Sequence, residues 1–446
     1  MNIAIVGAGW AGMAAAVTAT QAGHHATVFE ASSAVGGRAR GLKASLPDGT
    51  PVLLDNGQHI LIGAYTETLR LLRLVAVEPA SALLNQPMAL QFPDGAGIRF
   101  PDWPTPLDAL AGIVGARGWS LADKWALLRA AASWQLSGFV CPPDLSVTSL
   151  CQPLTARVKA ELIEPLCVSA LNTPADQASA SVFLRVLRDA LFGVAGGSHL
   201  LLPRVDLGAL FPEAAVNWIR QLGGVVHLKA RVDSVSRVGR QWQINGPALD
   251  QQASQRFAAV ILATSASNAA LALTQSALAA TNIISIGWLD WAALARSLAF
   301  EAIATVYAWA PAAALPRPML ALRCNAASPA QFVFDRAQLG GPAGLLAFVV
   351  SAAQGERQAL QARVLAQAHS QLGLTLQAVQ TVVEKRATFA CTPGLVRPPA
   401  QIAPGLFACG DYVAGPYPAT LEGAVISGVQ AVQRIAGSSL AKSAPL

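Results

Sequence analysis

The amino-acid sequence predicts an α/β fold in which a parallel, doubly wound sheet is combined with a second, discontinuous α+β domain. Three observations lead to this prediction. An apolar strand and a glycine-rich turn open the chain, an acidic residue ends the next apolar strand, and a further strand-and-turn motif lies near the C-terminus. Both ends of the chain therefore contribute to one sheet, and the sequence between them supplies the second domain.

The first strand, Ile3–Val6, is followed by a glycine-rich turn and a segment of helical composition, Ala11–Ala22. Gly7, Gly9 and Gly12 have the GxGxxG spacing of a Rossmann-like, dinucleotide-binding turn. Gly7 permits the tight turn, Gly9 lets the backbone approach a pyrophosphate, and Gly12 lets the helix pack on the strand. The helix N-terminus then presents free amides and the positive end of its dipole to the phosphates.

The second strand ends in an acidic residue about 20 positions after the glycine motif. The stretch AGHHATVFE supplies a turn, a strand and Glu30. A carboxylate at this position accepts hydrogen bonds from a ribose diol, so the predicted dinucleotide is FAD or NAD and not NADP. No second GxGxxG occurs in the sequence, which argues against a separate NAD(P)H domain.

A glycine pair and an arginine follow the second strand. Gly36, Gly37 and Arg38 would let a loop lie against the same pyrophosphate, with Arg38 as a charge-assisted donor. The alternative is a glycine-rich surface turn that carries a solvated arginine.

A polar cluster interrupts the apolar sequence LLDNGQHILIGAY at residues 53–65. Asp55, Asn56, Gln58 and His59 lie within five positions, with leucine and isoleucine on both sides. Burying four such groups without partners would cost several kcal/mol. The cluster, here called the polar knot, must therefore contact other polar groups.

The C-terminal motif resembles the N-terminal one in character. Leu406–Cys409 is typical of a buried strand, Gly410 and Asp411 of a turn, and Thr420–Ile435 of a helix. Asp411 would bind ribityl or phosphate oxygens, or it is an ordinary turn residue. Glu422 lies in the first turn of the helix, where a negative charge is favourable whatever the ligand, so we interpret it as structural.

The middle of the chain supplies two further strand regions. Residues 223–245 read as strand, turn and strand, where Val232 by itself is an ordinary hairpin residue. The uncharged segment 257–289 is interrupted by threonine, serine, asparagine and glutamine. It therefore predicts a strand, a loop and a helix, and not a membrane span.

Composition narrows the possible partners and location. The chain has 446 residues, of which 53% are hydrophobic and 13% charged, so it buries large surfaces or handles apolar material. The net charge of +6 comes without a long basic block, which argues against nucleic acid. Six cysteines without a CxxC pair or metal-ligand spacing predict reduced thiols, no metal site and a cytoplasmic protein.

The motifs together resemble the FAD-dependent amine oxidase and carotenoid desaturase superfamily. The features that carry this resemblance are GxGxxG, Glu30, GGR, the central strands and the closing GD…PATLEGAVISG. Within the superfamily, LLDNGQHILIGAYTETLRLL, the Trp-Pro pair at 103 and ACGDY…PATLEGAVISG are similar to the hydroxysqualene dehydroxylases, also called squalene-associated FAD-dependent desaturases.

The resemblance implies an FAD site that joins both ends of the chain. It places the polar knot beside the flavin ring, which would then supply partners for the polar side chains. Thr420 and Leu421 would bring helix N-terminal amides to the flavin C2 carbonyl. The predicted cofactor-binding residues are Gly7, Gly9, Ala11, Gly12, Glu30, Gly37, Arg38, Gly57, Gln58, His59, Val232, Gly410, Asp411, Thr420 and Leu421.

The same resemblance divides the chain into two domains and a tail. An FAD-binding domain is expected at residues 1–84, 200–280 and 390–437. A substrate-binding domain is expected at residues 85–199 and 281–389, and a flexible tail at 438–446.

The family's reaction is a reductive dehydroxylation. Hydroxysqualene, an apolar isoprenoid, loses its hydroxyl as water, and hydride from the flavin N5 of reduced FAD reaches the allylic carbon, which gives squalene, a hopanoid precursor. Because hydroxide is a poor leaving group, a proton donor is needed, and His59 is the candidate. Alternatively, its ring only fixes the loop by hydrogen bonding.

Two other classes of function stay open. One is an oxidative enzyme of the same superfamily, a carotenoid-type desaturase or an amine oxidase, for which Tyr412 and Tyr417 are the candidate aromatic residues. The other is a non-catalytic FAD-bearing isoprenoid carrier. The expected partners are the isoprenoid substrate and upstream enzymes of squalene synthesis.

The segment 103–140 has two interpretations. It carries Trp103, Trp119, Trp125 and Trp134 beside basic residues on an apolar background. This pattern fits helices in peripheral contact with the inner face of a membrane. It also fits lid helices that pack on the core of the substrate domain, which is the favoured interpretation because the helices are not strongly amphipathic.

Overall fold

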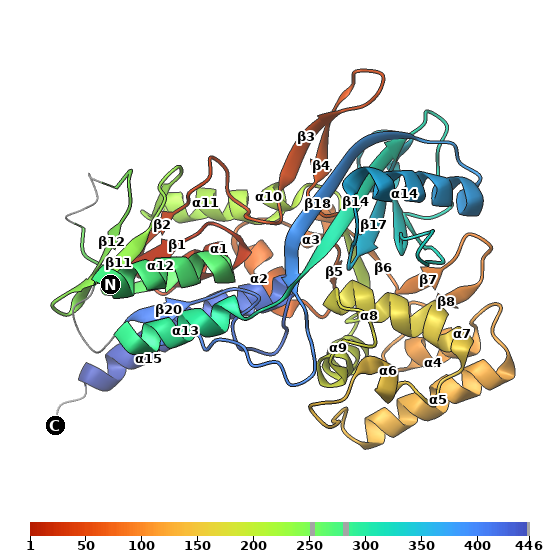
Figure 1. Cartoon of the computed structure of the whole chain (residues 1–446), viewed down its shortest axis with the longest axis horizontal. Coiled ribbons are helices and arrows are strands. Elements are labelled where there is room, and N and C mark those ends of the chain that lie inside the picture. Colours follow the sequence, from red (N-terminus) through yellow and green to blue (C-terminus); the bar gives the residue numbers. More distant parts are fainter. Residues whose placement is uncertain (250–254, 280–284, 444–446) are drawn as a thin grey trace.

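The computed structural model describes residues 1–249, 255–279 and 285–443 (Figure 1). At one end of the elongated molecule, helices surround the sheet that contains β1, β2 and β20. At the other end lie a second sheet, covered by α14, and a cluster of helices from α4 to α9. The long strands β14 and β18 run between the two ends.

A six-stranded sheet in the order β10-β2-β1-β13-β20-β19 organises the first end. Five strands are parallel, and β19 (Gln401–Ala403) is antiparallel at the edge. The direction of winding reverses between β1 and β13, and folds of this kind bind dinucleotides at that switch point. The α/β fold class predicted from the sequence is confirmed. The parallel strands are β10 (Val225–His227), β2 (His25–Phe29), β1 (Asn2–Val6), β13 (Ala259–Leu262) and β20 (Leu406–Ala408).

Helices cover this sheet closely. In α1 (Trp10–Gln21), alanines dominate the buried positions, so the helix can approach the sheet and α15 (Leu421–Ser443). A Cβ at Gly428 of α15 would lie 2.3 Å from the carbonyl oxygen of Ala11, which shows how close the two helices are. The other helices here are α10 (Leu207–Leu210), α11 (Pro212–Gln221), α12 (Ala266–Ala279) and α13 (Ser285–Arg296).

Two boundaries differ from the sequence prediction. Helix α15 continues to Ser443 instead of ending at Ile435, so residues 438–443 of the expected tail are helical, while 444–446 lie outside the described residues. Helix α13 packs beside α12, and Arg296 donates to Thr274 at 2.9 Å. We therefore propose that the substrate domain resumes at β14 and not at residue 281.

A five-stranded antiparallel sheet, ordered β15-β16-β17-β14-β18, organises the other end. Because successive side chains of a strand point to opposite sides, the sheet has two distinct faces. Ala304, Val306 and Phe348 pack under α14 (Arg357–Leu372), whereas the opposite face is lined by aromatic and aliphatic side chains. The strands are β14 (Phe300–Trp309), β15 (Met319–Ala321), β16 (Phe332–Asp335), β17 (Leu345–Ser351) and β18 (Gln377–Phe389).

A helical lobe lies beside this sheet (Figure 1). Of its four tryptophans, Trp119 and Trp134 are buried, whereas Trp103 and Trp125 are 57% and 67% exposed. None of the helices in the described part of the chain combines the length and apolar character needed to cross a bilayer. The lobe contains α4 (Leu107–Val114), α5 (Leu121–Leu136), α6 (Val147–Leu150), α7 (Ala156–Val158), the π-helical turn Lys159–Ile163, α8 (Glu164–Leu171) and α9 (Ala180–Phe192).

Small sheets and short helices connect the two ends. The strand β9 (Leu200–Pro203) pairs with β5 and β6 and so links three separate stretches of chain. The remaining elements are β3 (Gly41–Ser45), β4 (Pro51–Asp55), β5 (Leu61–Ile62), α2 (Thr66–Leu74), α3 (Pro79–Ala82), β6 (Leu83–Gln86), β7 (Ala89–Gln91), β8 (Gly97–Arg99), β11 (Ser234–Val238), β12 (Gln241–Asn245) and the 3-10 turn Ala337–Leu339.

Candidate active site

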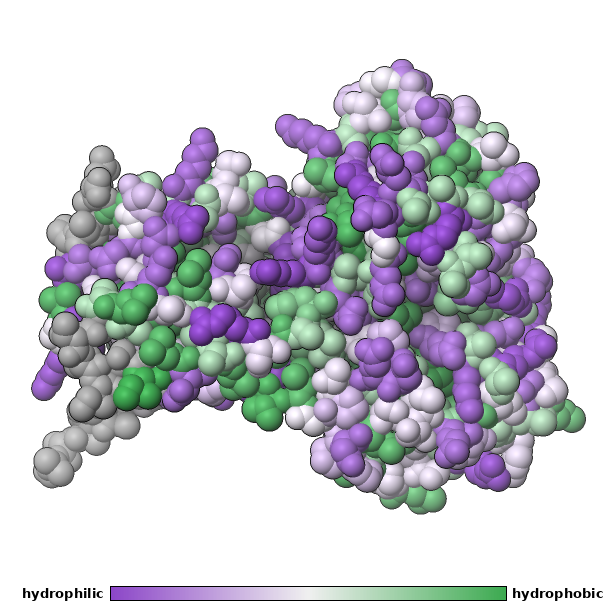
Figure 2. Space-filling model, in the orientation of Figure 1, coloured by the Kyte–Doolittle hydropathy of each residue, from purple (hydrophilic) through white to green (hydrophobic). Residues whose placement is uncertain are grey.

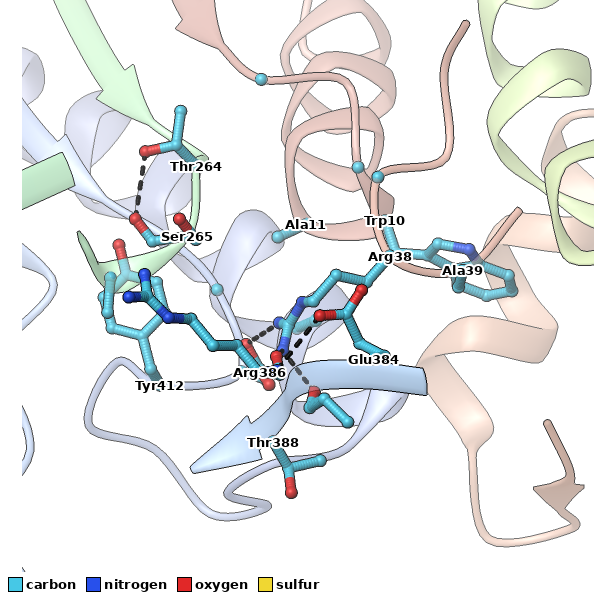
Figure 3. Close-up of a pocket in the computed structure, with 18 of the residues that line it drawn as sticks. Trp10, Ala11, Arg38, Ala39, Thr264, Ser265, Glu384, Arg386, Thr388 and Tyr412 are labelled. Carbon is cyan, nitrogen blue, oxygen red and sulfur yellow. Dashed lines mark hydrogen bonds and ion pairs between the residues drawn. The ribbon is translucent and has the colours of Figure 1, made fainter. Parts of the chain in front are cut away.

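One cavity of about 750 Å³ extends from the carboxyl ends of the parallel strands to the face of the five-stranded sheet that lies opposite α14. Figure 3 shows part of its lining. Every residue predicted to bind the cofactor lines this cavity except Gly12. Those residues are Gly7, Gly9, Ala11, Glu30, Gly37, Arg38, Gly57, Gln58, His59, Val232, Gly410, Asp411, Thr420 and Leu421.

The glycine turn after β1 is closely packed on its protein side. Gly7 has a φ of +109°, and a Cβ there would lie 2.7 Å from the carbonyl oxygen of Ala263. Gly12 faces back into the turn, because a Cβ at this position would lie 2.0 Å from the carbonyl oxygen of Gly7. At Gly9 the nearest protein atom would be 3.9 Å away, at Gly37. The turn therefore leaves free space only toward the cavity.

Glu30 holds this turn in place. One carboxylate oxygen accepts from the amide of Ala8 at 2.7 Å, and the other from the amide of Ser32 at 2.8 Å. A carboxylate has about four acceptor positions, so capacity remains for a ligand. The carbonyl of Glu30 accepts from Ala230 at 2.8 Å, which aligns the segment before Val232 with the cavity wall.

Arg38 and Asp411 pair with each other across the cavity wall. Their side chains form a 2.7 Å ion pair, and the Arg38 guanidinium also donates to the carbonyls of Arg386 and Ala387 (Figure 3). The charge of Asp411 raises the pKa of Arg38. The sequence predicted that each would contact the cofactor's polar groups by itself, or lie in a turn. In the structure they neutralise each other and join three distant segments, and both line the cavity.

The polar knot is organised by Asp55. Its carboxylate accepts from the amides of Gly57 at 3.3 Å and His59 at 2.8 Å, and it contacts His59 Nδ1 at 3.0 Å. Burial, the largest single influence, would lower the pKa of His59, but the charge of Asp55 and its hydrogen bond to the ring together outweigh burial and raise that pKa. Burial would raise the pKa of Asp55, yet its contacts with His59 lower it. Each partner thus favours the charged form of the other.

Two side chains of the five-stranded sheet hold the knot from outside. Arg336 donates to the Gln58 side-chain oxygen at 3.2 Å, and the Tyr307 hydroxyl donates to the Asp55 carbonyl at 2.6 Å. Asn56 donates to the carbonyl of Arg38. The expectation that the flavin supplies these partners is therefore wrong for the buried side chains, because the protein itself satisfies them.

The start of α15 completes the cavity wall. Thr420 Oγ1 accepts from the Gly423 amide at 2.9 Å and so caps the helix. The Glu422 carboxylate is buried and accepts from the amides of Glu67 and Thr68, both at 2.9 Å. Glu422 thereby caps α2, which agrees with its interpretation as a structural residue.

Two buried polar atoms in the lining have no hydrogen-bond partner among the described residues. They are the indole nitrogen of Trp10 and the hydroxyl of Tyr412. Burial raises the pKa of Tyr412 well above its ordinary value, so the hydroxyl keeps its proton. Buried donors of this kind are normally satisfied, and a ligand in the cavity can satisfy them. Tyr417, the other candidate for an aromatic cage, does not line this cavity.

The opposite end of the cavity is apolar. Its walls come from strands β14, β16 and β17, with a few polar groups from α8 and β18. The apolar lining residues are Phe300, Ile303, Phe332, Phe334 and Val349.

Sequence reasoning missed several residues of the site for two different reasons; some of them line the cavity, and others support the polar knot from behind its wall. Thr264 and Ser265 follow β13 directly, so the end of that predicted strand was a usable signal. Arg336 and Tyr307 carry no local signal, because their partners lie 278 and 252 positions away. No cluster of three or more potential metal ligands occurs among the residues that the structure describes.

Comparisons with known proteins agree with this geometry. The family model described as flavin containing amine oxidoreductase matches residues 10–436. A hydroxysqualene dehydroxylase of Sinorhizobium fredii is 25% identical over 248 residues, which cover 53% of this chain and 55% of the relative. The chain thus matches about half the length of that relative.

Two further relatives match very different fractions of this chain. A hydroxysqualene dehydroxylase of Rhodopseudomonas palustris is 24% identical and matches 97% of this chain and 98% of its own length. A 15-cis-phytoene desaturase of Synechococcus elongatus is 31% identical over 26% of this chain and 24% of its own.

Solved structures share the fold at low sequence identity. The crystal structure described as a putative protoporphyrinogen oxidase from Exiguobacterium matches with a TM-score of 0.67 and 16% identity, over 98% of this chain and 99% of the other. Reduced UDP-galactopyranose mutase matches with a TM-score of 0.69 and 13% identity, over 98% and 96%. These likenesses concern the fold alone.

Proposed function

The chain belongs to the family of flavin containing amine oxidoreductases, and from this premise we propose that it reduces hydroxysqualene to squalene. It is an FAD-dependent oxidoreductase, and reduced FAD bound in the cavity supplies a hydride. The observation that carries the proposal is the His59 ring, which lies in the cavity wall with Nδ1 3.0 Å from the Asp55 carboxylate, in a cavity whose far end is apolar.

The residues at the end of the cavity beside β1 fit FAD. The glycine turn leaves room for a pyrophosphate beside Gly9, and the acceptor positions remaining on Glu30 suit a ribose diol. The unpartnered donors of Trp10 and Tyr412 would gain acceptors. The pairing of Arg38 with Asp411 leaves backbone amides as the main phosphate donors.

His59 would supply the proton that the departing hydroxyl needs. Its Nδ1 faces Asp55, which fixes the ring and favours the imidazolium form, so Nε2 is the nitrogen left for a substrate. The ring lies directly over Gly57, where a Cβ would come within 2.8 Å of it. Gly57 is therefore required for this ring position.

The proposed reaction balances with one proton and one hydride. The allylic C–O bond of the substrate breaks, and its oxygen takes the proton of His59 and leaves as water. The carbon gains the hydride, so the substrate is reduced by two electrons and FAD ends oxidised. Cleavage of an allylic C–O bond leaves positive charge on carbon, and the lining by Phe332, Phe334 and Val349 would exclude water from it.

The apolar end of the cavity and the names of the relatives support the same substrate class. A long hydrocarbon fits walls that present phenylalanine, valine and isoleucine side chains, since apolar contact with them is favourable. Near the polar knot, His59 offers a charge-assisted donor to a hydroxyl.

An anaerobic single-turnover experiment tests the proposal. Protein reduced with dithionite, with excess reductant removed, is mixed with hydroxysqualene, and we expect oxidised flavin absorbance to appear together with stoichiometric squalene. If instead phytoene or an amine reduces the oxidised flavin and hydroxysqualene has no effect, the enzyme is oxidative. Binding of hydroxysqualene without a spectral change would identify a carrier.

A variant separates the role of His59 from the choice of substrate. We expect His59→Asn to bind FAD and to slow single turnover by at least about 100-fold, the usual contribution of a positioned acid. The matched control is His199→Asn, because His199 contacts Asn85 and does not line the cavity. Undiminished turnover of His59→Asn would remove this residue from the reaction while leaving the substrate assignment intact.

A further inference from the structure

An exposed apolar surface covers helices α4 and α5 of the helical lobe. We call it the α4–α5 face, and its exposed side chains project from consecutive turns of α4 and from the first two turns and the last turn of α5. Figure 2 shows apolar side chains at the lower and right edges of the lobe that carries α5. The residues of the face are Leu107, Leu110 and Val114 of α4 and Leu121, Trp125 and Leu136 of α5.

The helical spacing places the exposed apolar side chains of each helix on one side of it, and on α5 the exposed Arg129 lies between Trp125 and Leu136. On α5, Leu121 is 85%, Trp125 67% and Leu136 89% exposed, and these positions recur on one side of a 3.6-residue helix. The other side of α5 is occupied by the buried Leu127 and Trp134. Each helix therefore packs one apolar side on the core and presents a second one outward.

The charge displayed by the segment 103–140, which carries this face, is positive, and the exposed Asp102 and Asp144 lie just outside this segment. Within residues 103–140, the acidic residues are Asp108 and Asp123, and both are buried. Asp123 bonds the Ser120 cap, and Asp108 accepts from Ser198 at 3.2 Å. The basic residues of the same segment, Arg117, Lys124 and Arg129, are exposed or half-exposed.

We infer that the α4–α5 face binds the surface of an anionic lipid membrane. A helix that lies in the membrane interface combines large apolar side chains, tryptophan and flanking basic residues, because acyl chains and anionic headgroups meet at that depth. The face has all three. The inference does not depend on the substrate, since it rests on surface residues outside the cavity.

Vesicle flotation of the full-length, FAD-loaded protein tests this inference. Vesicles of phosphatidylcholine alone are compared with vesicles that also contain phosphatidylglycerol. We expect binding to the anionic vesicles, and we expect the triple variant Leu121→Gln, Trp125→Gln, Leu136→Gln to bind at least about tenfold more weakly. Replacing Arg117 and Arg129 by glutamine should weaken binding by about fivefold for each charge removed.

The matched control is a variant with Leu222→Gln and Val396→Gln, whose side chains are 57% and 67% exposed outside the helical lobe. It should bind anionic vesicles as the wild type does. Flavin absorbance and melting temperature verify that each variant is folded. Equal binding of the triple variant and the wild type would overturn the inference, as would equal binding to neutral and anionic vesicles. So would a concentration-dependent dimer that the triple variant abolishes, because the face would then join two copies of this chain.

Discussion

The two ends of the cavity are built in different ways. The end beside β1 consists mainly of backbone, and its contacts join residues close in sequence, such as Ala8 and Glu30, which lie 22 positions apart. The end beside the polar knot consists of side chains whose partners come from far away, such as Arg336 for Gln58. We therefore expect added side-chain volume to disturb the end beside β1, and the loss of a hydrogen bond or a charge to disturb the end beside the polar knot.

This difference in construction fits the different ligand groups that the two ends would contact. A backbone cradle recognises phosphate and sugar, which every molecule of the cofactor carries, so it needs space and free amides. The knot contacts the five-stranded sheet through Tyr307 and Arg336, and this sheet also forms the apolar wall. Changes in the second domain can thus adjust the reacting end without disturbing the cradle.

The largest expected effect comes from adding one carbon to the cradle. In Gly12→Ala the new Cβ would lie 2.0 Å from the carbonyl oxygen of Gly7 and 3.0 Å from the Ala263 side chain, so the turn must move. Overpacking of this kind costs about 2–3 kcal/mol. We expect urea titration to show that loss and the purified protein to lack bound FAD absorbance.

Gly9→Ala is the matched control for this prediction. Its Cβ would have no protein atom nearer than 3.9 Å, and it would enter the cavity. This variant should keep the stability of the wild-type apoprotein but bind FAD more weakly. If both variants are equally stable without the cofactor, then packing against the turn is not the role of Gly12.

The sequence predicted the first end well because its geometry is local. A strand, a GxGxxG turn, a helix and a terminal acid follow one another within 30 residues, and backbone rules are sufficient to assemble them. The knot residues were also found from sequence, since four polar groups in an apolar stretch are unusual. Their partners were not, because no local pattern relates Asp55 to Tyr307.

The ion pair between Arg38 and Asp411 also could not be predicted from a local sequence pattern. Each residue was assigned to the cofactor from its own motif, and each motif does line the cavity. Their mutual ion pair depends on how the two ends of the chain meet, and this arrangement is set by packing of α1 on α15. Sequence reasoning therefore located the wall of the site but not the contacts within it.

Removing one hydroxyl that supports the polar knot should lower the stability of the apoprotein by less than Gly12→Ala does. Tyr307→Phe removes a buried 2.6 Å hydrogen bond to the Asp55 carbonyl, which should lower the free energy of unfolding of the apoprotein by about 1–2 kcal/mol. Tyr412→Phe is the matched control, since that hydroxyl has no partner among the described residues. Its removal should not lower apoprotein stability. Equal losses in the two variants would contradict the distinction between them.

The smallest expected effect is a pH dependence of the knot, and its sign follows from the two shifted pKa values. Because the folded-state pKa of His59 is raised, its pairing with Asp55 stabilises the fold fully below the ordinary value of 6.5 and loses that contribution as pH rises through the folded-state pKa. The lowered pKa of Asp55 keeps the pair intact in acid until pH falls below the ordinary value of 3.8.

The melting temperature of the wild type should therefore exceed that of His59→Asn by about 1–2 °C at pH 5–6, and the gap should close in alkaline solution. In an Asp55→Asn background the same substitution should give no such gap, because the charge that raises the pKa of His59 is gone. A gap that widens with rising pH would mean that His59 is neutral in the folded protein. A neutral imidazole would keep its one N–H proton on Nδ1, which faces Asp55, and would have none on Nε2 to give a departing hydroxyl, so this measurement tests the reacting end of the cavity without any substrate.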